Sequence, residues 1–278
     1  MILIADSGST KTDWVLIDNK CELFFTTEGI NPLFIDKSRV ENQIKDNFPK
    51  AYLLRDVKEV FIYAPSCSLI ERANLVKEPL SNIFKAARIE VESDLLGAAR
   101  SLFKQKKGIV CILGTGSSSA FFNGSTLVQK TNSLGYILGD EASGANLGME
   151  FVKLYLNNLL DKETHDLFYQ TYKMDTNNVI DKVYRAPYPN RFLASFSPFL
   201  LANLHKESIR NLVKMSFSIF IERHILTYSE SKEVPIAFVG SIAFYFRDLL
   251  KEVATNYNIK IDKISQKPIK DLLDYHTN

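Results

Sequence analysis

The segment GIVCILGTGSSSAFFNGSTLVQKTNSLGYILGDEASGANLG, residues 108–148, holds eight of the twelve glycines of this 278-residue chain. Its opening residues 109–113 are apolar and predict a buried strand, and residues 119–122 predict a return strand that ends at an Asn-Gly turn. The tip between them, Gly114-Thr115-Gly116-Ser117, is rich in backbone N–H and hydroxyl groups. Such a tip is typical of a cradle for anionic oxygens, since glycine lets the backbone approach a ligand closely.

The N-terminus repeats this design. Residues 1–5 predict an apolar strand, residues 6–12 (DSGSTKT) a polar tip, and residues 13–18 the return strand. Gly8 would let the backbone approach a phosphate, Ser9 and Thr10 would donate hydrogen bonds, and Asp6 would hold Mg²⁺, which prefers oxygen ligands. A single hairpin of this kind is more often a plain polar turn. Because the design occurs twice, about one domain length apart, we predict that the two tips hold a polyphosphate from opposite sides.

Two further turns follow predicted strands. Asp94 follows the strand at residues 88–91 and precedes a helix at residues 95–103, at the carboxyl end where open α/β sheets bind ligands. The alternative is that Ser93 or Asp94 only caps that helix. Gly240-Ser241 follows the strand at residues 234–239 and opens a helix at residues 242–254, although a plain strand-to-helix turn has the same sequence.

Four of these segments resemble one protein family. Asp6–Asp13 (DSGSTKTD), Leu113–Ser118 (LGTGSS), Gly139–Gly144 (GDEASG) and Val239–Ala243 (VGSIA) are similar, in order, to the phosphate-1, phosphate-2, sugar-loop and adenosine motifs of the N-acetylglucosamine kinase family. That family belongs to the actin-like, sugar-kinase and heat-shock-chaperone superfamily of ATPases. Each motif is weak alone, but the four together run from residue 6 to residue 243.

The resemblance implies an α/β fold with two ribonuclease H-like (actin-like ATPase) domains and a nucleotide and sugar cleft between them. We expect the first domain at residues 1–105, joined by a C-terminal helix at residues 265–278, and the second domain at residues 106–264. The length of the chain suits two such domains.

The resemblance also implies roles for individual residues. Asp94 matches the general base, and Asp6 matches a Mg²⁺ ligand. Contacts with ATP are expected from Gly8, Ser9, Thr10, Lys11, Gly114, Thr115, Gly116, Ser117, Gly240 and Ser241. Contacts with the sugar are expected from Asn31, Tyr136 and Asp140.

Alternatives stay open at several of these positions. Asn31 precedes a proline and is equally typical of a turn, Tyr136 is equally typical of a core residue, and a first-turn helix acid explains Glu141. Leu134 stands where the family commonly has tryptophan, between two glycines, which leaves the identity of the sugar open.

The implied activity is ATP-dependent phosphorylation of an amino sugar, most simply N-acetylglucosamine at its 6-hydroxyl. The alternatives are a kinase of glucosamine or N-acetylmuramic acid, an ATPase that activates iron–sulfur dehydratases, and a sugar sensor without catalysis. Three dispersed cysteines, Cys21, Cys67 and Cys111, disfavour the dehydratase activator, which needs cysteines at a cluster. The combination of Asp6, Asp94, Thr115 and Asp140 disfavours a sensor.

Composition excludes several other partners. A net charge of +2 and 24% charged residues give no basic patch for nucleic acid. No apolar run approaches a membrane span and no signal peptide precedes the first strand, so we expect a cytoplasmic protein. The four histidines lack the spacing of a zinc site, and the oligomeric state, monomer or homodimer, stays open.

Overall fold

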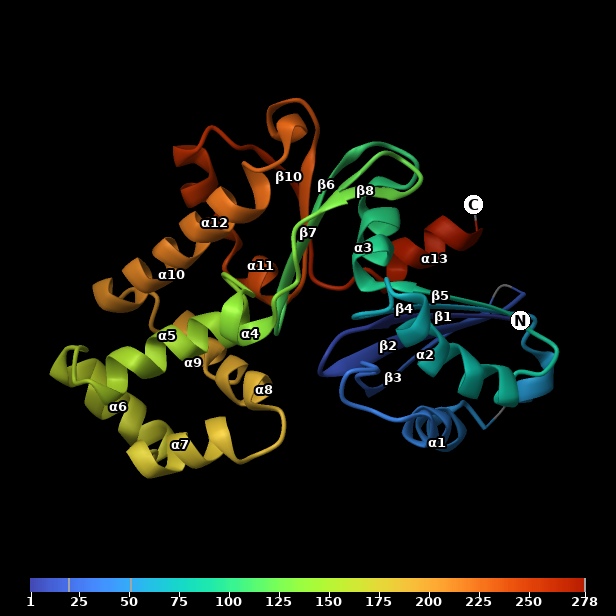
Figure 1. Ribbon diagram of the computed structural model, residues 1–278, viewed down its shortest axis with the longest axis horizontal. Helices are drawn as coiled ribbons and strands as arrows, with labels where there is room; N and C mark the ends of the chain where they lie inside the picture. The colour runs from blue at the N-terminus through green and yellow to red at the C-terminus, as the bar shows by residue number, and fades with distance from the viewer. Residues whose placement is uncertain (20, 51, 278) are drawn as a thin grey trace. The chain divides into compact units, whose positions relative to one another are not determined.

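The computed structural model describes residues 1–19, 21–50 and 52–277. The chain forms two compact units, each with its own five-stranded sheet (Figure 1). Unit 1 comprises Met1–Lys106, Asn123–Leu127 and Lys267–Asn278, and unit 2 comprises Lys107–Phe122 and Val128–Gln266.

The sheet of unit 1 has the strand order β3-β2-β1-β4-β5. Its strands are β1 (Ile2–Ser7), β2 (Lys11–Asp18), β3 (Cys21–Glu28), β4 (Glu59–Ala64) and β5 (Arg88–Ser93). The first three strands are antiparallel, and β4 and β5 continue the sheet parallel to β1. The carboxyl ends of β1, β4 and β5 therefore lie at one edge, which is where ligands bind in open α/β sheets.

Helices cover both faces of this sheet, because neighbouring residues of a strand point to opposite faces. Leu3 and Ala5 pack in the cluster that includes α1 (Lys37–Asn47) and α2 (Ile70–Ile83). Ile4 packs instead with Ile269, Leu272 and Leu273 of α13 (Ile269–Thr277), on the face that Figure 1 shows beside α3 (Asp94–Phe103). A short 3-10 helix, Leu54–Asp56, precedes β4. Burial on both faces explains the continuous apolar run of β1.

The sheet of unit 2 repeats this order as β8-β7-β6-β9-β10. Its strands are β6 (Gly108–Leu113), β7 (Ser117–Phe122), β8 (Leu127–Lys130), β9 (Ile236–Val239) and β10 (Ile261–Ser265). β6 is antiparallel to β7 and parallel to β9, and β10 is parallel to β9. The two units thus share one topology, as the predicted pair of related α/β domains requires.

Unit 2 carries most of the helices. They are α4 (Gly135–Leu138), α5 (Gly144–Leu156), α6 (Lys162–Tyr172), α7 (Thr176–Tyr184), α8 (Pro189–Ala194), α9 (Ser197–Ala202), α10 (Glu207–Phe220), the π-helical turn Ile221–Ile225, the 3-10 helix Ser229–Lys232, α11 (Ser241–Tyr245) and α12 (Arg247–Asn256). One continuous core that includes Phe151, Phe168, Phe217 and Phe238 packs them on the sheet.

One predicted helix was wrong in its bounds. The single helix expected at residues 242–254 is broken at Phe246 into α11 and α12. Near it in the core, α10 ends at Phe220 and the chain continues as the π-helical turn.

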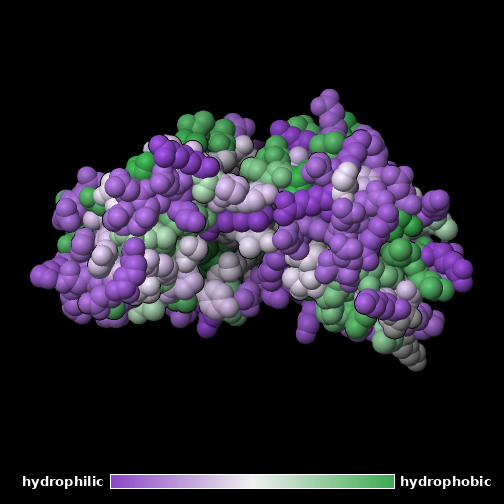
Figure 2. Space-filling model, turned by 90° about the horizontal axis from the view of Figure 1, so that it is seen from below, coloured by the Kyte–Doolittle hydropathy of each residue, from purple (hydrophilic) through white to green (hydrophobic). Residues whose placement is uncertain are grey.

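Figure 2 shows hydrophilic residues over most of the face that it draws, with apolar groups scattered among them. Among the residues that the structure describes, no helix combines the length and the apolar character needed to span a bilayer.

Candidate active site

The hairpin tip of unit 1 is shorter than the sequence predicted. Asp6 lies within β1 and Lys11 begins β2, so that Gly8, Ser9 and Thr10 alone connect the two strands. The strands extend further because Asp6 pairs with Asp13 across the sheet. Within the turn, the N–H of Gly8 donates to the carbonyl oxygen of Lys11 at 2.8 Å.

Asn31 lies directly beside this tip. The N–H of Gly29 donates to the carbonyl oxygen of Thr10 at 3.1 Å, and the N–H of Ile30 donates to the Ser7 hydroxyl at 2.8 Å. The Asn31 side chain is buried, and its Oδ1 accepts a hydrogen bond from the N–H of Leu33 at 3.0 Å. The side chain therefore forms the turn that was the alternative to sugar contact, and its role toward a sugar stays a prediction.

Asp6 is affected by the charges of two other carboxylates of unit 1. Burial, together with the charges of Asp94 and Asp13, raises the pKa of Asp6 to about 7. Burial also acts to raise the pKa of Asp13, but a hydrogen bond from Lys11 Nζ at 2.9 Å and the charges of Lys11 and Lys267 hold it below its ordinary value. Asp6 therefore exchanges a proton near neutral pH, whereas Asp13 stays ionised.

Asp94 opens α3 at the end of β5. The Ser93 hydroxyl accepts from the N–H of Leu96 at 3.2 Å, so Ser93 is the residue that caps the helix. Burial raises the pKa of Asp94 to about 6, although Asp94 Oδ1 accepts from the N–H of Leu95 at 2.8 Å. A partly buried carboxylate with a pKa just below neutrality is suited to accept a proton at physiological pH.

The hairpin tip of unit 2 presents donors. The carbonyl oxygens of its three tip residues accept backbone hydrogen bonds, Gly114 from Gly144 at 2.8 Å, Thr115 from Ala145 at 3.1 Å and Gly116 from Gly114 at 3.0 Å. The hydroxyl of Ser117 is buried and is one of four buried side-chain atoms without a hydrogen-bond partner in the described part of the chain. The acceptors of this tip are thus occupied, and Ser117 keeps an unused donor.

Asp140 contacts this tip within unit 2. The N–H of Ser117 donates to Asp140 Oδ1 at 3.2 Å, and a Cβ atom at Gly116 would lie 3.0 Å from Asp140 Oδ2. Burial raises the pKa of Asp140 although the Ser117 N–H opposes the shift. The residue predicted to bind the sugar therefore also lies against the residues predicted to bind phosphate.

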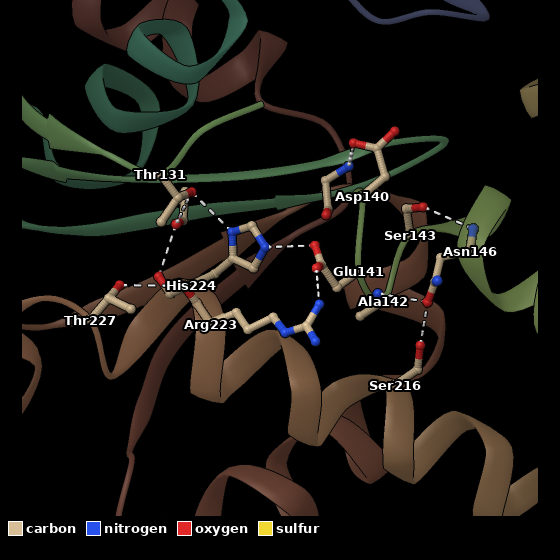
Figure 3. Close-up of polar contacts among 12 residues, drawn as sticks. Thr131, Asp140, Glu141, Ala142, Ser143, Asn146, Ser216, Arg223, His224 and Thr227 are labelled. Carbon is tan, nitrogen blue, oxygen red and sulfur yellow. Dashed lines mark hydrogen bonds and ion pairs between the residues drawn. The ribbon is translucent and has the colours of Figure 1, made fainter. Parts of the chain in front are cut away.

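Glu141 is not a first-turn helix acid, which corrects the simple explanation for it. α5 begins at Gly144 with Ser143 as its cap, and the carboxylate of Glu141 points to other partners (Figure 3). Glu141 Oε1 accepts from Arg223 Nη1 at 2.8 Å, and Glu141 Oε2 lies 2.9 Å from His224 Nε2. Burial acts to raise the pKa of Glu141, but these two hydrogen bonds hold it below its ordinary value.

Sequence reasoning missed Arg223 and His224. In the sequence they stand among apolar residues such as Phe220, Ile221 and Ile225, with no motif around them. Nothing in the local sequence connects them to Glu141.

The remaining predicted residues of unit 2 lie in two places. Gly240 has φ +117°, and a Cβ atom there would lie 2.3 Å from the carbonyl oxygen of Leu113, so only glycine fits between β9 and the end of β6. Ser241 is the first residue of α11. Tyr136 is partly buried and packs against the core of unit 2, and Leu134 is 54% exposed.

No group of three or more histidine, cysteine, aspartate or glutamate side chains among residues 1–19, 21–50 and 52–277 is arranged to hold a metal ion. This does not conflict with a Mg²⁺ site, because Mg²⁺ is usually bound by one or two carboxylates and the phosphates of a substrate.

Comparison with solved structures assigns the family. An N-acetylglucosamine kinase candidate from Porphyromonas gingivalis is 38% identical to this chain. The match covers 99% of this chain and 98% of the Porphyromonas gingivalis chain, with a TM-score of 0.94. The chain belongs to the N-acetylglucosamine kinase family.

More distant structures show the same fold. An N-acetylglucosamine kinase candidate from Chromobacterium violaceum is 18% identical, with 99% of this chain and 98% of that chain covered and a TM-score of 0.74. A ROK family glucokinase from Streptomyces griseus, solved with glucose and AMPPNP, is 13% identical, with 99% and 97% covered and a TM-score of 0.55. No protein-family model and no curated protein matches the chain. The predicted family and the predicted actin-like α/β fold are confirmed.

Proposed function

We propose that this chain is an ATP-dependent amino-sugar kinase that transfers the γ-phosphoryl group to the 6-hydroxyl of N-acetylglucosamine. The observation that carries the proposal is its 38% identity, over 99% of its length, to the Porphyromonas gingivalis structure that bears this name.

The glycines of the two tips support nucleotide binding. A Cβ atom at Gly8 would come no closer than 3.7 Å to the Lys11 carbonyl oxygen, and at Gly114 no described atom lies within 4 Å. The fold therefore has room for larger side chains at both positions. Packing therefore does not explain why these two residues are glycines, whereas the close approach of a phosphate to the backbone does.

The carboxylates of unit 1 fit Mg²⁺. Asp6 and Asp13 face one another across β1 and β2. Burial is the main cause of the raised pKa of Asp6, and the charges of Asp94 and Asp13, which a cation would neutralise, add to it. Asp6 would hold the ion, with Asp13 kept ionised nearby by Lys11. When bound, Mg²⁺ supplies neutralisation of charge on the transferred phosphoryl group.

Asp94 acts as the general base in this proposal. A sugar hydroxyl is a weak nucleophile, and a carboxylate within hydrogen-bond distance takes its proton as the new O–P bond forms. With a pKa of about 6, Asp94 is mostly ionised at neutral pH. Asp140 is the proposed partner of the sugar hydroxyls.

An ATP-consumption assay with N-acetylglucosamine, glucosamine and N-acetylmuramic acid tests the proposal, with phosphorus NMR of the product to locate the phosphate. We expect the highest kcat/KM for N-acetylglucosamine. If only one of the other two sugars is phosphorylated, that sugar replaces N-acetylglucosamine as the proposed substrate. Binding of a sugar by calorimetry without any turnover would favour the sensor instead. The second candidate is a different amino sugar, because Leu134 replaces the tryptophan of the family.

A further inference from the structure

The carboxylate of Glu141 is held at both oxygens by neighbouring residues of one helical turn. Arg223 Nη1 donates to Oε1 at 2.8 Å, and His224 Nε2 donates to Oε2 at 2.9 Å. Because an ionised carboxylate only accepts hydrogen bonds, the Nε2 atom of His224 carries the hydrogen in this contact. The side chain of Glu141 is only 12% exposed and that of His224 8%, so solvent competes little for the second contact.

The backbone on either side of Glu141 is strained. Asp140 has φ 53° and Ala142 has φ 59°, both in the left-handed region that residues with a Cβ atom rarely adopt. Such conformations persist only where the surroundings fix them. Here Asn146 Oδ1 accepts from the N–H of Ala142 at 3.2 Å, and the two contacts of Glu141 fix the residue between.

The turn that provides Arg223 and His224 is itself unusual. Ile221–Ile225 is π-helical and directly continues α10. Single π-helical turns within helices are rare and are frequent at functional sites. In Figure 3 both side chains extend from this turn toward Glu141.

The imidazole of His224 is fixed on its other sides as well. Its Nδ1 lies 2.9 Å from Thr131 Oγ1, and its ring stacks on Phe220 with centroids 4.7 Å apart and planes inclined by 9°. A histidine held in this way does not follow Glu141 if the loop moves. It is a rigid support for the loop.

We infer that Arg223 and His224 are positioning residues for the sugar loop, by which we mean residues 139–143, the part of the sugar-loop motif that precedes α5. They hold Glu141, and through it the left-handed conformation of Asp140 that brings the Asp140 carboxylate to the N–H of Ser117. Neither residue is assigned a contact with the substrate. The inference rests on the proposed function, because the ligand it serves is the amino sugar.

The variants Arg223→Gln and His224→Gln test this inference. Arg223 is suitable because its side chain is 65% exposed, so its replacement leaves the core intact even if His224→Gln folds poorly. Arg210→Gln is the matched control, since Arg210 lies on α10, which the π-helical turn continues, and forms a surface ion pair with Glu252 of α12. We expect the KM for the sugar to rise about tenfold in Arg223→Gln and His224→Gln, with kcat and the KM for ATP changed less than about twofold.

Amide hydrogen exchange of residues 139–143 without substrate gives a second, direct measurement. Exchange should be about tenfold faster in Arg223→Gln than in Arg210→Gln. Equal exchange rates in Arg223→Gln and Arg210→Gln overturn the inference. So does a sugar KM that is unchanged in Arg223→Gln and His224→Gln when the wild type is active. If the wild type phosphorylates no sugar, the proposed function fails, and the exchange rates still decide whether Arg223 positions the loop.

Discussion

The two units share a strand order but differ at the equivalent ends of their strands. In unit 1 the pair before the first hairpin tip is Asp6 with Asp13, and in unit 2 the corresponding pair is Ile112 with Ser118. Unit 2 instead receives its carboxylate, Asp140, from a loop outside the sheet. The same hairpin thus presents built-in negative charge in one unit and backbone and hydroxyl donors in the other.

The connections between strands differ as well. Residues 29–58 link β3 to β4 in unit 1, whereas residues 131–235 link β8 to β9 in unit 2 and include the sugar loop and the π-helical turn. A duplicated sheet therefore supplies the framework, and the long connection of unit 2 supplies the groups proposed to recognise the sugar. The carboxylates of unit 1, Asp6 in β1 and Asp94 at the start of α3, are those proposed for the cation and the proton transfer.

The largest expected effect concerns the residues that follow β5 and β10, the equivalent last strands of the two sheets. β5 is followed by Asp94, whereas β10 is followed by Gln266. We expect Asp94→Asn to lower kcat by about 10²–10⁴-fold with little change in the KM for the sugar, because the amide cannot accept the proton. Steady-state kinetics with N-acetylglucosamine measures this.

Asp46→Asn serves as its control, because Asp46 is an exposed acid on α1 of the same unit. The wild-type kcat should also fall as the pH drops below about 6, following protonation of Asp94. A kcat in Asp94→Asn equal to that of Asp46→Asn would remove Asp94 as the base and with it this difference between the units.

Two glycines in different settings, Gly240 between β9 and α11 and Gly8 in the first hairpin tip, should separate folding from binding. At Gly240 an alanine would have φ +117° and a Cβ atom 2.3 Å from a carbonyl oxygen, so we expect Gly240→Ala to lower the free energy of unfolding by roughly 3–4 kcal/mol. Gly8→Ala meets no such contact and should change the free energy of unfolding by less than ~0.5 kcal/mol. Urea unfolding compares the two.

Gly8→Ala should nevertheless raise the KM for ATP, since its Cβ atom would occupy the space proposed for a phosphate. A folded Gly8→Ala enzyme with unchanged KM for ATP would show that the tip of unit 1 does not approach the nucleotide closely.

The charged pair of unit 1 should respond to pH with opposite signs. The pKa of Asp6 is raised, from 3.8 to about 7, so the folded state loses stability as the pH rises through this range. Asp6→Asn should therefore raise the free energy of unfolding by about 2–3 kcal/mol at pH 8 and leave it unchanged near pH 4, while abolishing activity. Denaturant titrations at the two pH values measure this.

Asp13→Asn is the matched comparison. The pKa of Asp13 is lowered, so its ionised form stabilises the folded state above its unfolded pKa, and that stability is lost as the pH falls. Asp13→Asn should therefore destabilise the protein at pH 8. The same sign of change in both variants would contradict the assigned charges.

Much of the framework followed from the sequence. The strand expected at residues 109–113 and the helix expected at residues 95–103 each begin one residue after β6 and α3 begin and end at the same residue. The apolar runs of β1, β6 and β9 were recognisable because both faces of these strands are buried. By contrast, β8 is an exposed edge strand with no apolar alternation, and α2 contains Pro79, which ordinarily ends a helix.

The candidate site was predictable only where a motif was local. Asp6, Asp94 and the two tips are each marked by neighbouring glycine, serine or threonine residues. The contacts of Glu141 with Arg223 and His224 join residues 82 and 83 positions apart, through a π-helical turn that no local pattern indicates. Such contacts depend on how the long connection of unit 2 packs against its own sheet.

The smallest expected effect concerns the hydroxyls that end the two hairpins. Thr12 and Ser117 occupy equivalent positions, opposite the last residues of β1 and β6. Thr12 Oγ1 lies 2.7 Å from Ser7 Oγ and donates to the carbonyl oxygen of Glu28 at 3.0 Å, whereas the Ser117 hydroxyl is buried without a partner. Thr12→Val should therefore cost ~1–2 kcal/mol of unfolding free energy, and Ser117→Ala none.

Ser117→Ala should instead raise the KM for ATP several-fold, because the hydroxyl that the fold leaves unpaired is then missing from the phosphate tip. A buried hydroxyl without a partner destabilises a protein, so its presence in unit 2 calls for a ligand, as the bonded Thr12 of unit 1 does not. Ser117→Ala with an unchanged KM for ATP, whatever its stability, would contradict this difference and would leave the Ser117 hydroxyl unexplained. Calorimetric titration of AMPPNP into both variants, beside their urea midpoints, distinguishes the two results.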